Sequence, residues 1–110
     1  MVGNENLIEI VKGLVSTNPQ VREETCERVC DWLQSFDQRE VSVVSSLLSS
    51  VAVLESDADC LESELHAIGE LTETGLVEAV QLTPLCSLSM ERLDVSAREH
   101  LSYLMSEYFQ

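Results

Sequence analysis

The sequence predicts an all-α fold in which three antiparallel helix pairs stack on one another within a single domain, residues 1–110. Three observations support this prediction. Apolar residues recur three and four positions apart along most of the chain, as they do in helices with one buried face. Turn residues divide the chain into six such segments with short connections, so consecutive helices must lie side by side. Three of the segments also align with one another, and their starts are 39 and 37 residues apart.

The first predicted pair covers residues 4 to 36. A helix is expected over residues 4–16, with an apolar stripe of Leu7, Ile10, Val11, Leu14 and Val15. Asn18 should cap a second helix that has Pro19 at its first position, where the missing N–H of proline costs nothing. That helix should end near Phe36, and its buried stripe is Val21, Thr25, Val29, Trp32 and Leu33.

The second predicted pair begins at Asp37. Asp37 and Glu40 form an acid-substituted capping box, which opens a third helix to about Leu54. This segment is rich in Val and Ser, so a strand is an alternative, but its length and capped start favour a helix. Asp57 should cap a fourth helix, whose buried stripe is Leu61, Leu65, Ile68 and Leu71, and Gly75 marks the turn that follows.

The third predicted pair contains a proline in its first helix. That helix should begin at Leu76, Val77 and Val80, and Thr83-Pro84 should end or kink it because proline clashes with the preceding turn. A short continuation is expected at Leu85, Leu88 and Leu93. Asp94 should cap the last helix, whose inward residues are Ala97, Leu101, Leu104, Met105 and Tyr108.

The charge of the chain restricts its partners. Twenty Asp and Glu face six Lys and Arg, which gives a formal net charge of −14. Such a surface repels phosphate, so binding to nucleic acid or to an anionic membrane is disfavoured and a basic protein partner is favoured. The alternative is that the acid serves only solubility. With no secretory signal and no apolar stretch long enough to span a membrane, the sequence indicates a cytoplasmic protein.

Little in the sequence points to catalysis or to a cofactor. The only histidines are His66 and His100, and no serine-hydrolase, metalloprotease or phosphate-loop motif is present. The four cysteines form no CxxC pair and have no matching histidine pair, so we expect no zinc and no other cofactor. Reduced, partly buried thiols are predicted instead, and the chain is predicted not to be an enzyme.

The aligned segments carry a resemblance to a known superfamily. Two of them read Asn18-Pro-Gln-Val-Arg and Asp94-Val-Ser-Ala-Arg, a capping residue followed by a small or apolar residue and Arg. This pattern resembles the second helix of HEAT and armadillo repeats, although the middle copy has Leu61 where Arg is expected. The resemblance implies a solenoid of helix pairs whose second helices line a binding surface, and a compact six-helix bundle is the alternative.

The alignment also places acidic residues in columns. Residues four apart in the second helix of each pair share one helical face, opposite the buried stripe. The predicted partner-binding residues are Glu23, Glu27 and Asp31, then Glu62, His66 and Glu70, then Glu99, Tyr103 and Glu107. Tyr103 would supply an aromatic anchor. The alternative explanation for these columns is that any amphipathic helix carries charged residues on its solvent-exposed face.

Two kinds of binding protein fit these expectations. In size and charge the chain resembles small acidic immunity proteins, which neutralise a basic toxin such as a nuclease. A helical-repeat adaptor, or a scaffold segment that binds a basic protein or peptide, is the alternative. Polar residues on the outer faces of the first and last helices favour a complete capped domain, whereas a segment would expose apolar stripes. A zinc or redox protein is the least supported class.

Overall fold

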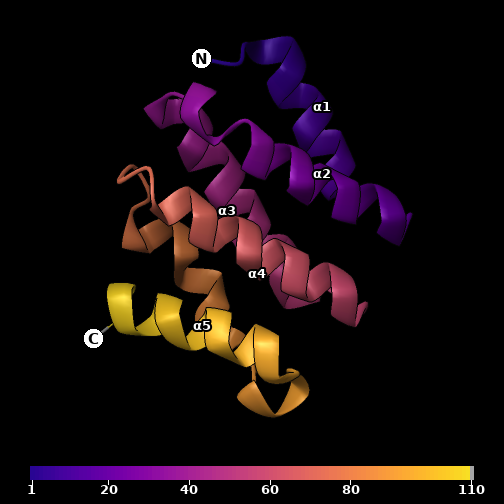
Figure 1. Cartoon of the computed structure of the whole chain (residues 1–110), viewed down its shortest axis with the longest axis vertical. Coiled ribbons are helices and arrows are strands. Elements are labelled where there is room, and N and C mark those ends of the chain that lie inside the picture. Colours follow the sequence, from indigo (N-terminus) through magenta and orange to yellow (C-terminus); the bar gives the residue numbers. More distant parts are fainter. Residues whose placement is uncertain (110) are drawn as a thin grey trace.

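The computed structural model describes residues 1–109, and all regular secondary structure within that range is helical (Figure 1). The α-helices are α1 (Asn4–Leu14), α2 (Pro19–Asp31), α3 (Gln38–Leu54), α4 (Ala58–Thr72) and α5 (Val95–Tyr108). Three 3₁₀ helices accompany them: η1 (Leu33–Ser35), η2 (Ala79–Ser87) and η3 (Met90–Arg92). The all-α prediction is confirmed, and the strand alternative for the Val- and Ser-rich segment is wrong.

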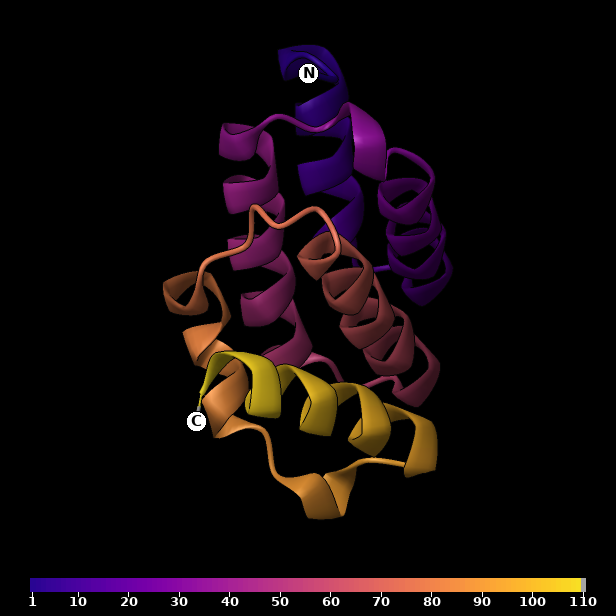
Figure 2. The same cartoon turned by 60° about the vertical axis from the view of Figure 1, so that its left-hand side comes forward.

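The helices contact one another in two rows. In one row α1 packs on α3 and α3 packs on η2; in the other, α2 packs on α4 and α4 packs on α5. The rows are joined by contacts between α1 and α2, between α3 and α4, and between η2 and α5. Figure 1 shows α2, α4 and α5 following one another down the molecule, and Figure 2 shows α3 beside them. The Cα extents are 38 × 31 × 18 Å, and the shortest accommodates two helix layers about 8–10 Å apart.

Four of the helices begin at the capping residues that the sequence predicts. The side chains of Asn18, Asp57 and Asp94 each accept a hydrogen bond from a backbone N–H in the first turn, at 2.9 Å. Asp37 and Glu40 form the reciprocal capping box, with distances of 2.8 and 3.0 Å. These caps fix where α2, α3, α4 and α5 begin.

Glu40 also holds the start of the chain. Its carboxylate accepts hydrogen bonds from the backbone N–H groups of Val2 and Gly3, both at 3.0 Å. Burial alone would raise the pKa of this fully buried carboxyl, but the three backbone donors and the nearby amino terminus hold it below its usual range. One ionised side chain of α3 thereby anchors the segment that leads into α1.

The largest departure from the predicted fold lies at the fifth helix. An α-helix is expected from Leu76, but residues 79–87 form a 3₁₀ helix with Pro84 inside it. Pro84 has no N–H to donate and its ring crowds the preceding turn, so an α-helix is disfavoured here. Val80, which the sequence places in the start of that helix, is 73% exposed. The second helix also ends earlier, at Asp31, and η1 follows it.

Most of the predicted apolar stripes form the core. All four stripe residues of α4 are buried, and so are Leu7, Ile10 and Leu14 of α1 and Ala97, Leu101 and Leu104 of α5. Val15 and Val21 are exceptions, since both are exposed near the α1–α2 connection. Gly75 has a φ of 74°, as a turn glycine should. Within residues 1–109, no helix combines the length and apolar character needed to cross a membrane.

Candidate functional site

The row formed by α2, α4 and α5 carries a surface hollow of about 390 Å³. Its walls come from three helices: Glu23 from α2, four residues from α4, and His100 from α5. The α4 contribution is Asp59, Glu62, Ser63 and His66. Glu23 and Glu62, which the sequence alignment places in one column, therefore line the same hollow. We call this the α5-side hollow.

A second hollow of about 280 Å³ lies between α2 and α4. It is lined by Cys26, Glu27, Cys30 and Asp31 of α2 and by Ser63 and His66 of α4. Glu27 and His66 belong to one predicted column and meet here. Because Ser63 and His66 also line the α5-side hollow, the two hollows adjoin; together they form what we call the acidic groove.

Glu70 extends the acidic groove along α4. Its Oε1 lies 3.7 Å from Nε2 of His66. Burial, and after it the charges of Glu70, Asp31 and Glu27, raise the pKa of the Cys30 thiol to about 11. Carboxylates from both helices therefore act on this thiol. The predicted residues of α2 and α4 are thus brought together.

The predicted residues of α5 lie differently. Glu99, Tyr103 and Glu107 are exposed, Tyr103 by 47%, but none lines the groove. Tyr103 and Glu107 lie near Tyr108, whose phenol pKa is raised by burial first and then by those two groups. The helix meets the groove through His100 instead. The α5 part of the predicted columns is therefore exposed beside the groove rather than within it.

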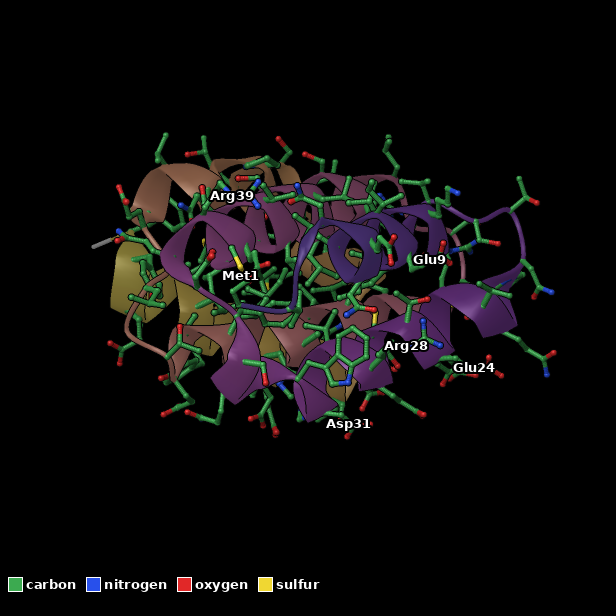
Figure 3. The ribbon with its side chains drawn as sticks, turned by 90° about the horizontal axis from the view of Figure 1, so that it is seen from above. Met1, Glu9, Glu24, Arg28, Asp31 and Arg39 are labelled. Carbon is green, nitrogen blue, oxygen red and sulfur yellow. The ribbon has the colours of Figure 1, made fainter. Side chains whose placement is uncertain are left out.

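The groove is lined by acidic side chains and by two histidines. Among the described residues, no Lys or Arg lines either hollow. Lys12 and Arg28 lie beside another surface hollow, with Glu9 and Glu24, between α1 and α2. Figure 3 shows Glu9, Glu24 and Arg28 together at the α1 end of the molecule, and Arg39 apart from them. Within the described chain, the groove carboxylates thus have no Lys or Arg among their lining neighbours.

A polar cluster joins α2 to α4 and to the α3–α4 connection. Arg22 of α2 donates from Nε and Nη2 to the two carboxylate oxygens of Glu55, at 2.8 and 2.7 Å. Cys60 of α4 donates its thiol to the carbonyl of Pro19 at 3.1 Å. Glu64 of α4 is completely buried, and neither of its carboxyl oxygens has a hydrogen-bond partner within the described chain. The bidentate pair orients α2 relative to the α3–α4 connection.

The four cysteines are free thiols, as predicted. Cys26 and Cys60 are buried, Cys30 is half-buried and Cys86 is exposed. Burial raises the pKa of Cys60 to about 12, with the charges of Glu55 and Asp57 adding to it. Burial raises the pKa of Cys26 further still, with Glu64 adding to it. Thiols shifted in this direction are poor nucleophiles at neutral pH.

Sequence reasoning missed five residues that line the groove: Asp59, Ser63, His100, Cys26 and Cys30. Asp59 is three residues from Glu62 and Ser63 is three residues from His66 on α4, so helical spacing could have found these two. Ser63 and His100 occupy the alignment column next to the acidic one. In residues 1–109, no group of three or more His, Cys, Asp or Glu side chains is arranged to hold a metal ion.

Comparison of the chain with protein-family models, with curated proteins and with solved structures finds no match.

Proposed function

We propose that this chain is a non-enzymatic, cytoplasmic protein-binding module whose acidic groove receives a basic segment of another protein. The observation that carries the proposal is the composition of the groove. Carboxylates from α2 and α4 converge on two adjoining hollows that no Lys or Arg lines among the described residues. Like charges held together repel one another, and a basic partner would relieve that repulsion on docking.

The proposed fold type is a HEAT-like solenoid of three helix pairs. In its support, α2, α4 and α5 contact one another in sequence order, as second helices of successive pairs would, and η2 takes the place of the first helix in the last pair. The compact six-helix bundle remains the alternative. In a solenoid, residues at equivalent positions of neighbouring helices form continuous rows, which suits the binding of an extended or helical segment.

Within this class, an acidic immunity protein that neutralises a basic toxin such as a nuclease is the function we favour. The net charge of −14 would speed association with a basic protein, since electrostatic steering raises association rates by orders of magnitude. Exposed Tyr103 beside the groove would add an aromatic contact. Glu99 and Glu107 on the same helix would contact the rim of the partner.

A helical-repeat adaptor or scaffold segment is the second candidate. It is favoured by apolar side chains that stand exposed away from the groove: Leu54 is 84% exposed and Val15 is 56% exposed. Both line a hollow of about 320 Å³ beside Arg22 and Glu55. A protein with two separate contact surfaces would suit assembly of a larger complex.

Affinity purification from the native cell tests the proposal. The chain is immobilised, lysate is applied at low ionic strength, and bound protein is eluted with rising salt. We expect a basic protein to elute as salt is raised, because screening weakens exposed charge pairs beyond a Debye length of about 8 Å at physiological salt. Retention of no basic protein, or elution that salt does not affect, would contradict the proposal. Loss of a toxin activity in the complex distinguishes immunity from adaptor function.

A further inference from the structure

Two histidines meet across the contact between α4 and α5. The rings of His66 and His100 lie edge to face, with centroids 5.5 Å apart and planes at 63°. Both rings line the α5-side hollow. The side chain of His66 is 52% exposed, so protons exchange freely with solvent at this position. These are the only two histidines of the chain.

Acidic groups face this pair from two helices. On its own helix, His66 has Glu70 at 3.7 Å, and Asp59 and Glu62 share the hollow with it. The charged and titratable groups facing the pair from α2 are Glu23, Glu27, Asp31, Cys26 and Cys30. His100, a member of the pair, is the α5 residue that lines this hollow. No cationic side chain among the described lining residues offsets the carboxylates.

We propose that His66 and His100 make the acidic groove pH-sensitive, so that their protonation releases a basic partner. The inference rests on the proposed function and describes the regulation of that same site. Histidine is the side chain whose charge ordinarily changes between pH 5 and 8, whereas ordinary Asp and Glu carboxyls remain ionised in this range. Protons bound by the two rings change the formal charge of the α5-side hollow from −3 to −1 without moving any helix.

The magnitude follows from the distances. For a lysine ammonium placed as far from each imidazole as the two rings lie from one another, 5.5 Å, the effect can be worked from Coulomb's law. At the dielectric constant of water, each imidazolium weakens the binding of that ammonium about fourfold, and the two together roughly tenfold. Protons and the basic partner thus compete for the same carboxylates, and the coupling between them is reciprocal.

The test uses the full chain and a peptide of eight lysines that carries a rhodamine label. Its Kd is measured by fluorescence anisotropy at constant ionic strength, at pH 7.5 and pH 5.5. We expect the Kd of the native chain to rise roughly tenfold at pH 5.5. The double variant H66Q/H100Q should lose most of the pH dependence, so that its Kd values at pH 7.5 and pH 5.5 are nearly equal, whatever its affinity at pH 7.5. Circular dichroism at both pH values verifies that each chain stays folded.

The possible failures are distinguishable. Equal pH dependence in the native chain and in H66Q/H100Q, or no pH dependence in the native chain, overturns the histidine inference and leaves the proposed function in place. Absence of peptide binding at pH 7.5, or equal binding by a chain carrying D31K, E70K and E107K, overturns the proposed function itself.

Discussion

Replacing Glu64 with Gln should stabilise the protein at neutral pH. Glu64 is fully buried in α4 and its carboxyl oxygens have no hydrogen-bond partner among the described residues. Burial raises the pKa of this carboxyl to about 9, and the neighbouring Glu55 carboxylate contributes in the same direction. The group is therefore neutral in the folded protein at pH 7, whereas it ionises in the unfolded chain above its ordinary pKa of 4.5.

The sign and size of the effect follow from linkage. A pKa that is higher in the folded state gives stability that is fully present below pH 4.5 and is lost as the pH rises towards 9. Above pH 4.5 this group lowers the free energy of unfolding by about 1.4 kcal/mol per pH unit. At pH 7 the free energy of unfolding is therefore about 3 kcal/mol lower than it would be with the group neutral in both states. Gln cannot ionise. E64Q should therefore be more stable than the native chain by up to about 3 kcal/mol at pH 7 and show no such gain at pH 4.5.

Urea unfolding followed by circular dichroism at pH 5, 7 and 9 measures this difference. Burying the Gln amide lowers the free energy of unfolding of E64Q by the same amount at every pH. The informative quantity is therefore how the stability difference between E64Q and the native chain changes with pH, not its size at one pH. E62Q is the matched control, because Glu62 lies on the same helix but is only partly buried. The reasoning is refuted if the stabilities of E64Q and the native chain run parallel between pH 5 and pH 9.

Three further substitutions test the packing of the helices. R22A should lower the free energy of unfolding by about 3–5 kcal/mol, because it leaves the Glu55 carboxylate buried without its partner; a loss below about 1 kcal/mol in urea unfolding would contradict this. G13A should destabilise by about 1–3 kcal/mol, since a Cβ there would collide with the side chain of Thr25. G69A, whose Cβ would enter open space, should stabilise by up to about 1 kcal/mol. Equal changes in stability for G13A and G69A would contradict the close contact of α1 with α2 at Gly13.

The helix starts could be predicted because capping is a local interaction. Asn18, Asp37, Asp57 and Asp94 each bond to backbone N–H groups two or three residues away, and such spacings are legible in a sequence. The 3₁₀ form of residues 79–87 was harder to predict. Pro84 indicated a kink or an end, but which helical form the segment takes depends on its packing against α3 and α5.

Long-range polar contacts could not be predicted. Arg22 and Glu55 are 33 residues apart, and nothing in their local patterns indicates that they pair. Glu64 lies beside the stripe residues Leu61 and Leu65, yet its polarity suggests a solvent-facing position. Such placements are set by how α2 packs on α4, which the spacing of apolar residues fixes only approximately.

The candidate site could also be predicted only in part. The structure places Glu23 and Glu62 in one hollow and Glu27, Asp31 and His66 in the adjoining one. On α5 the groove is met by His100 rather than by Glu99. Neighbouring residues of a helix point about 100° apart, so a modest rotation of α5 relative to the alignment exchanges one for the other. Sequence alignment carries no information about that rotation.

The central claim is that the acidic groove and its rim bind a basic protein. The most direct measurement compares the Kd of the purified partner for the native chain, for D31K/E70K/E107K and for E9K/E24K/E91K. Both triple variants change the net charge equally, but Glu9 and Glu24 line the hollow between α1 and α2 rather than the groove, and Glu91 lies in η3. The account predicts strong loss of binding only in the first variant, with helical content intact in both. Equal affinity of the first variant and the native chain, or equal loss in both variants, would contradict it.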